Sequence, residues 1–200
     1  MQKISRVQTP PLLGDYRQYK SFLRIDFRWR CCYCGVRERK WGGATHFAVE
    51  HFKPKSAFPE LETVYSNLYY ACDGCNCYKW RHWPTPSDLA SGRRFFDICS
   101  DVPREHFWLD REGDLNHVSA CGAYTIKLIR LNRTILVQIR REYLALLRQF
   151  KQSVRAVRGL RMLSATCQEI EKKKLIEQTI AVLESNLQRI RDYCTDGPLD

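Results

Sequence analysis

Two pairs of cysteines, each with two residues between its members, are the first chemically capable feature of this 200-residue chain. Cys31 and Cys34 form the first pair, and Cys72 and Cys75 form the second. Two thiolates on one tight turn supply half of a tetrahedral coordination sphere, and a second such turn completes it. Because four thiolates leave no position open for a substrate, we expect a structural Zn²⁺ that holds the fold.

The stretch between and just after the pairs contains a second group of chemically capable side chains. Glu50 and His51 follow a β-like run, Asn67 lies mid-loop, and Asn76 directly follows the last paired cysteine. A neutral imidazole, with an ordinary pKa of about 6.5, accepts a proton from water at physiological pH. Each residue alone also has a structural explanation: a packed histidine, a turn asparagine or, for Asn76, a helix N-cap. Together they look like a hydrolytic centre on a zinc-stapled scaffold.

Composition indicates the cellular compartment in which the chain functions. Ten cysteines in a chain of this length are too few for a disulfide scaffold, so we expect a reducing compartment and one metal site. Cys32 and Cys77 break the paired spacing and are expected to pack, although an exchange of ligands stays open. The sequence has no apolar run long enough to span a bilayer and no signal-peptide pattern after Met1. We therefore expect a cytoplasmic protein with no membrane partner.

The spacing of apolar residues, Gly and Pro predicts the elements of the N-terminal half. Aromatic and apolar residues recur at helical spacing within 14–28, which predicts an amphipathic helix. A strand is expected near 45–49. A helix is expected to begin at Asn76 and to end before the prolines of 83–86. Residues 87–118 are expected to be irregular.

The C-terminal half has the pattern of long helices. Apolar residues recur every three or four positions from Ala123 to Val157, which predicts one continuous helix that Gly159 ends. A second pattern of the same kind runs from Ile170 to Ile190. Two long helices with a short connection predict an antiparallel hairpin.

The ordered motifs around the cysteines resemble those of the HNH endonuclease family. The matching elements are C-x-Y-C-G from Cys31, Glu50-His51 with Pro54 after it, Asn67-Leu68, and C-x-x-C-N from Cys72 with Lys79 after it. Any one element is weak, whereas the ordered set is specific. The match runs over about 30–80 and is most similar to members whose ββα-metal core is stapled by four cysteines.

The resemblance implies a role for each matching residue. His51 takes the place of the general base that activates water, and Asn67 that of the residue orienting the loop that bears the base. Glu50 and Asn76 match the ligands of a catalytic Mg²⁺ or Mn²⁺, distinct from the zinc, that would polarise the scissile phosphate. Family members often carry His or Asp at these two positions, so this ligand set is a variant.

Together the resemblance and the element pattern predict an α+β fold. A small ββα-metal core, treble-clef-like and stapled by zinc, is expected to follow an N-terminal helix and to precede a hairpin of long helices. The expected parts are an N-terminal arm and helix over 1–29, the nuclease core over 30–86, an irregular connection over 87–122 and the helical hairpin over 123–200.

The charge balance favours a polyanionic partner. The chain has 33 Lys and Arg against 22 Asp and Glu, for a net charge of +11, and duplex DNA is the partner that we expect first. Candidate phosphate contacts are the basic residues near the motif and along the first long helix: Lys53, Lys55, Lys79, Arg133, Arg140, Arg148 and Arg155. A solvated polar face is the alternative explanation for each of them.

The motif followed by long helices also resembles HNH proteins of bacterial phage-defence loci, such as Septu-type systems, which act beside an ATPase. This resemblance implies that the C-terminal helices dock an ATPase partner. The leading hypothesis is a metal-dependent DNA endonuclease in anti-phage defence, because the chain keeps both the base and the metal ligands. Two alternatives stay open: a zinc-stabilised nucleic-acid-binding or adaptor module without catalysis, and an HNH-type nuclease that acts on RNA.

Overall fold

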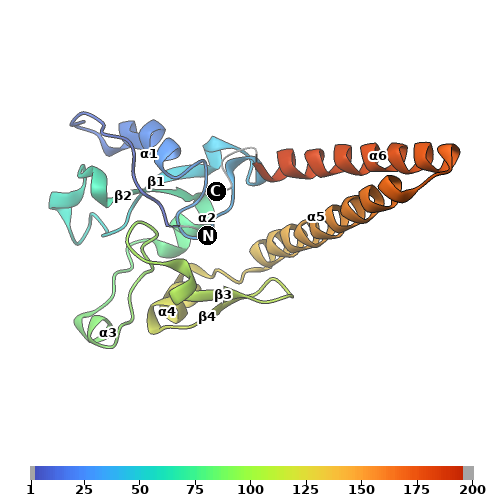
Figure 1. Ribbon diagram of the computed structural model, residues 1–200. Helices are drawn as coiled ribbons and strands as arrows, with labels where there is room; N and C mark the ends of the chain where they lie inside the picture. The colour runs from blue at the N-terminus through green and yellow to red at the C-terminus, as the bar shows by residue number, and fades with distance from the viewer. Residues whose placement is uncertain (1–2, 196–200) are drawn as a thin grey trace. The chain divides into compact units, whose positions relative to one another are not determined.

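The predicted α+β class is confirmed by a computed structural model that describes residues 3–195, with side chains through residue 191 (Figure 1). Spatial contacts divide the chain into two units, Met1–Gln138 and Ile139–Asp200, and each is described by itself. The strands are β1 Phe47–His51, β2 Leu68–Cys72, β3 Phe107–Leu109 and β4 Leu115–His117. The α-helices are α1 Lys20–Asp26, α2 Asp73–Lys79, α3 Pro86–Ala90, α4 Ala120–Ile129, α5 Thr134–Thr166 and α6 Ile170–Thr195.

The core of the first unit is an antiparallel hairpin that runs directly into a helix. β1 pairs with β2 so that Glu50 lies opposite Tyr69 and His51 lies opposite Leu68. All five residues of β2 are buried, and α2 begins at the residue after the strand. Since α2 contacts both strands, β1, β2 and α2 form the ββα arrangement that the motif order predicts.

The N-terminal arm is tied to this core through a buried carboxylate. Within 14–28, the expected helix forms as a 3₁₀ turn at Tyr16–Tyr19 followed by α1. At the end of α1, the Asp26 side chain accepts hydrogen bonds from the backbone N–H groups of Val7 and Gln8, each at 2.9 Å. Tyr65, just before β2, donates to the same carboxylate at 2.7 Å. Asp26 therefore joins three segments that are distant in sequence.

The predicted bounds of α2 are wrong at its beginning. The helix begins at Asp73 because Cys72, in an extended conformation, takes the N-cap position. Asn76 therefore lies within the helix and is not its cap. The helix ends at Lys79, before the prolines, because Trp80 adopts φ 45°, a left-handed conformation that a helix cannot contain.

The prediction of one continuous helix from Ala123 to Gly159 is also wrong. Arg130 takes a left-handed conformation (φ 50°, ψ 53°) that separates α4 from α5. Asn132, between the two helices, is held by a pair of 2.9 Å hydrogen bonds to the backbone N–H and C=O of Leu115. The apolar spacing continues across this break, so periodicity alone could not reveal it. Gly159 lies inside α5 and does not end it.

Residues 87–118 are more ordered than expected. α3 begins with a capping box in which Thr85 and Asp88 satisfy each other's backbone N–H groups. β3 and β4 form a short antiparallel hairpin with Leu109 opposite Leu115. Because each of these strands has three residues, neither shows the alternation that predicts a strand.

In the second unit, α5 and α6 pack together as the predicted antiparallel pair. Arg161 on α5 forms an ion pair with Glu184 on α6 at 2.5 Å. Earlier in α5, Phe150 lies under the guanidinium of Arg191, which is later in α6, with 5.6 Å from its Cζ to the ring centroid. From Phe150 to Arg161 along α5, the contacting residue on α6 moves back from Arg191 to Glu184, so the two helices run antiparallel. Among the residues that the structure describes, no helix is both long and apolar enough to cross a membrane.

Gly122 in α4 and Gly159 in α5 allow a paired test of how the two helices are packed. A Cβ on Gly122 would lie 2.2 Å from the carbonyl oxygen of His106, so we expect Gly122→Ala to destabilise the protein by about 1–3 kcal/mol. A Cβ on Gly159 would meet no described atom within 4 Å, so Gly159→Ala should stabilise α5 by about 0.5–1 kcal/mol. Urea unfolding followed by circular dichroism measures both changes. Loss of stability in Gly159→Ala would contradict an uninterrupted α5.

Candidate zinc centre and active site

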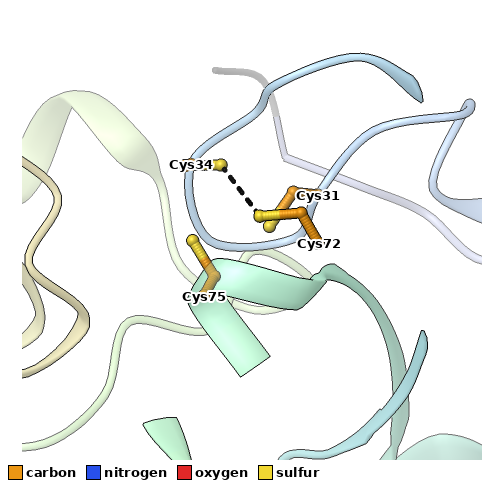
Figure 2. A group of neighbouring side chains, drawn as sticks. All are labelled: Cys31, Cys34, Cys72 and Cys75. Atoms are coloured by element: carbon orange, nitrogen blue, oxygen red, sulfur yellow. Dashed lines mark hydrogen bonds between the residues drawn. The ribbon is translucent and has the colours of Figure 1, made fainter. Parts of the chain in front are cut away.

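The four cysteines that the spacing singles out come together in the first unit. The sulfur atoms of Cys31, Cys34, Cys72 and Cys75 all lie within 4.8 Å of one another (Figure 2). The Sγ atoms of Cys34 and Cys72 are 3.8 Å apart. A tetrahedral zinc ion with Zn–S bonds of about 2.3 Å requires sulfur separations of about 3.8 Å. Both the donor set and this spacing therefore fit a structural Zn²⁺.

Local backbone geometry brings each pair to the cluster. The first pair lies on a tight turn in which Gly35, at φ 69°, donates its N–H to the Cys31 carbonyl at 2.9 Å. Cys72 is the last residue of β2, and Cys75 lies in the first turn of α2. Figure 2 shows the two segments facing each other across the sulfur atoms. The cluster thus joins the turn before β1 to the junction of β2 and α2.

Neighbouring cysteines are not part of this group among the described residues. Cys32 is buried, and burial raises the pKa of its thiol well above the ordinary range. Cys77 is exposed on α2. Their positions agree with the expectation that the x-x-spaced cysteines form the cluster and that these two do not.

A half-buried arginine contacts the cysteine cluster. Arg133, just before α5, points its Nη2 atom at the sulfur of Cys75 at 3.3 Å and at that of Cys72 at 3.9 Å. Burial is the largest single effect and lowers the pKa of the guanidinium, but the cysteines of the cluster together outweigh it, so the pKa of Arg133 lies above its ordinary value. Four thiolates around Zn²⁺ carry net negative charge, which this cation offsets. Arg133 was expected to contact phosphate, and the structure instead commits it to the cysteines.

Glu50 is held by a buried ion pair. Its Oε1 atom lies 2.9 Å from Nζ of Lys79 and accepts a hydrogen bond from the Tyr33 hydroxyl at 3.2 Å. Lys79 also donates to the carbonyl oxygen of His51 at 3.1 Å. Burial raises the pKa of Glu50 to about 7, although Lys79 opposes the rise. These contacts fix the end of β1 against the last turn of α2.

Lys79, like Arg133, was expected to contact phosphate, and its ammonium is engaged inside the protein instead. Its side chain is 0% exposed, and its ammonium is shared between Glu50 and the backbone of β1. An ammonium in this position has no path to a phosphate on the protein surface. The lysine after the second cysteine pair therefore stabilises the core.

The proposed ligands of a catalytic divalent ion have suitable chemistry but unequal surroundings. Glu50 supplies a carboxylate and Asn76 an amide oxygen, both of which suit Mg²⁺ or Mn²⁺. Asn76 is half-buried on α2, one turn before Lys79. Both polar contacts of Glu50 described above fall on Oε1. An ion at this position would share the Glu50 carboxylate with the Lys79 ammonium.

His51 is oriented as a neutral imidazole with one nitrogen in a fixed role. Its Nε2 donates to the carbonyl oxygen of Glu62 at 2.9 Å, and a carbonyl can only accept. In the neutral ring, Nδ1 is therefore the proton acceptor. Burial lowers the pKa of His51 from its ordinary value of 6.5, against the opposing effect of the Glu62 carbonyl. The Tyr16 ring packs edge-on against the imidazole, with 4.6 Å between ring centroids.

Asn67 fixes the backbone that follows His51. Its Oδ1 accepts from the backbone N–H of Lys53 at 2.8 Å, and its Nδ2 donates to the Lys53 carbonyl at 3.0 Å. Nδ2 also lies 3.3 Å from the carbonyl oxygen of Leu61. These backbone contacts suit a residue that orients the loop next to His51.

The other predicted basic residues lie in two separate places. In the first unit, Lys53 is exposed, and Lys55 forms a 2.7 Å ion pair with Glu62. In the second unit, α5 carries Arg148 and Arg155 as exposed residues and Arg140 as a half-buried one.

Sequence reasoning missed several residues that shape the site. Tyr33, Tyr16 and Glu62 contact Glu50 or His51 from segments on either side of β1. Tyr33 lies inside the first cysteine pair, which was the available signal, but no pattern indicated where its hydroxyl points. The contacts of Glu62 and Tyr16 depend on the fold of two loops and had no signal in the sequence.

Fold and site together define an α+β protein with a candidate four-cysteine metal centre. No family model matches the chain. Among curated proteins, the chain is similar to the Septu protein PtuA of Bacillus mycoides (strain KBAB4), with 25% identity over 142 residues. The match covers 60% of this chain and 20% of that protein, so the chain spans about a fifth of the length of the curated relative. The similarity to the Septu protein is distant and partial.

Removing Lys79 should cost stability in a pH-dependent way. In Lys79→Met the Glu50 carboxylate stays buried without its cation, so we expect a loss of about 3–5 kcal/mol at about pH 8. The loss should shrink at about pH 5.5, below the raised pKa of Glu50, because the folded state then holds a neutral acid. Urea unfolding at the two pH values measures the difference. The exposed-lysine control, Lys53→Met, should change little at either pH, and an equal loss for Lys79→Met at both would contradict the pairing.

Proposed function

We propose that the chain is a metal-dependent endonuclease of the HNH type that hydrolyses phosphodiester bonds of DNA. The observation that carries the proposal is the arrangement at the end of β1. There His51 is held as a neutral imidazole with Nδ1 as acceptor, next to Glu50, and α2 bearing Asn76 is fixed against the same strand. The motif order and the four-cysteine cluster support the same assignment.

In this proposal, His51 is the general base. Nδ1 takes a proton from a water molecule, whose oxygen attacks the scissile phosphorus in line with the leaving 3′-oxygen. The leaving 3′-oxygen takes a proton from solvent and His51 returns its proton to solvent, so the products carry 5′-phosphate and 3′-hydroxyl ends. Asn67 keeps the loop after His51 in place through its backbone hydrogen bonds. Glu50 and Asn76 would hold a Mg²⁺ or Mn²⁺ ion, which supplies Lewis-acid polarisation of the phosphate.

The basic residues that remain candidates for DNA contact are Lys53, Lys55, Arg140, Arg148 and Arg155. Lys79 and Arg133 are left out, because one is completely buried and the other is engaged by the cysteine cluster. Contacts of this kind bind the phosphate backbone and make affinity steeply dependent on salt. They carry no base sequence information by themselves.

We place this activity in anti-phage defence, in a Septu-type system. The support is the similarity to Septu protein PtuA, together with the resemblance of the motif and long helices to HNH proteins of defence loci. The paired helices α5 and α6 are the proposed docking surface for an ATPase partner. The alternatives are a nucleic-acid-binding or adaptor module without turnover, and a nuclease that acts on RNA.

Nicking of supercoiled plasmid with Mg²⁺ or Mn²⁺ tests the proposal. His51→Ala should lower the rate constant by about 100-fold or more, the range expected for loss of a general base. His117→Ala is the matched control, because His117 is exposed on β4. The wild-type rate should fall only as the pH drops below 6.5, since the pKa of His51 is lowered and the base is lost on protonation.

Zinc content and melting temperature must be the same in both variants for the comparison to count. Equal cleavage by His51→Ala and wild type would contradict the base assignment. Cleavage of RNA but not of DNA would move the proposal to the RNA alternative. No cleavage of either substrate, even with a protein encoded next to it added, would favour the binding module.

A further inference from the structure

A hollow of about 700 Å³ lies in the first unit between the end of α2 and α4. Its lining combines aromatic rings, Tyr78 and Trp80, with the basic residues Lys127 and Arg130 and with His82. No acidic side chain is among the described residues that line it. A concave surface that is aromatic and cationic at once has the composition of a site for unstacked nucleotides.

The exposure and the backbone conformation of Trp80 are both energetically unfavourable. Its side chain is 60% exposed, although it is one of the largest apolar groups in the chain. Its backbone adopts φ 45° and ψ −131°, a conformation that non-glycine residues rarely take. Arg130 in α4's C-cap also has a positive φ, of 50°. Strained residues of this kind concentrate at binding sites, and here two of them line the same hollow.

Cations lie against the aromatic rings of this region. The Arg81 guanidinium is 5.4 Å from the ring centroid of Trp80, and that of Arg130 is 4.9 Å from the ring centroid of Tyr78. Lys127, exposed on α4, lies three residues before Arg130 on the opposite wall. A base stacked on the Trp80 ring would thus have its phosphate within a cationic surface.

The hollow is next to the proposed catalytic centre along α2. The N–H of Trp80 donates to the carbonyl oxygen of Asn76 at 2.8 Å, so the hollow begins one helical turn beyond the proposed metal ligand. The hollow and the proposed metal ligand therefore share α2. Trp80 is the C-cap of α2, the helix that also carries Asn76.

We propose that this hollow binds an unpaired nucleotide, with its base stacked on Trp80 and its phosphate contacted by Lys127 and Arg130. The site then selects nucleic acid that is single-stranded or locally unpaired. The inference rests on the proposed function only in the choice of nucleic acid as the ligand. The site is tested by measuring binding without cleavage, so a failure of this inference can be distinguished from a failure of the proposed nuclease function.

Fluorescence anisotropy with a labelled oligonucleotide tests the site. The full chain carrying His51→Ala is titrated, without added divalent ions, against a single strand and against a duplex of the same sequence. Adding Trp80→Leu should weaken single-strand binding by about fivefold or more, the lower end of what stacking of one base contributes, and duplex binding by less than about twofold. Trp108→Leu is the matched control, since Trp108 is 53% exposed on β3 and does not line the hollow.

A charge variant gives a second, independent readout. Lys127→Gln should reduce the slope of log affinity against log salt for the single strand by about 0.7, as expected for one lost phosphate contact. Equal effects of Trp80→Leu and Trp108→Leu would overturn the proposal. So would an equal loss for duplex and single strand, or no measurable single-strand binding by the parent protein. Trp80-dependent binding in a protein that cleaves nothing would leave this site standing and remove the nuclease proposal.

Discussion

The convergence of four cysteines at one point is the constraint on which the rest of the first unit depends. The hairpin beneath the site has two strands of five residues each, and an isolated hairpin of that size is marginally stable in water. Structural zinc contributes about 10 kcal/mol or more to the folding of small modules. The cluster fixes the start of α2 against the turn before β1. Lys79 then ties the end of α2 to Glu50 and to the carbonyl oxygen of His51, so the helix is anchored at both ends.

Each buried charge around this centre has a partner, which explains why the site can hold so many polar groups. The guanidinium of Arg133 faces the sulfur atoms, Lys79 faces Glu50, and Asp26 accepts two backbone N–H groups and a tyrosine hydroxyl. His51 is different, because burial keeps it neutral. Glu50 is also shifted toward its neutral form, because burial raises its pKa to about 7 against the effect of Lys79.

Local signals in the sequence predicted the parts of the structure that depend on local geometry. The x-x spacing identified the four cysteines, and the order of the motifs indicated the β1, β2 and α2 arrangement. The apolar spacing predicted the paired C-terminal helices. The break at Arg130 was hidden because apolar spacing runs through it, and β3 and β4 were too short to show alternation. The roles of Lys79 and Arg133 could not be predicted, because their partners are far away in sequence. A basic residue looks the same in a sequence whether it meets a phosphate, a carboxylate or a thiolate.

Zinc content and zinc X-ray absorption of the purified chain test the central claim most directly. The account predicts about one zinc ion per chain, coordinated by four sulfur atoms at about 2.3 Å. Cys72→Ser should lose the ion and unfold the first unit, whereas Cys77→Ser, which changes an exposed cysteine on the same helix, should keep it. Absence of zinc, a coordination sphere of nitrogen and oxygen atoms, or equal zinc loss in the two variants would contradict the account.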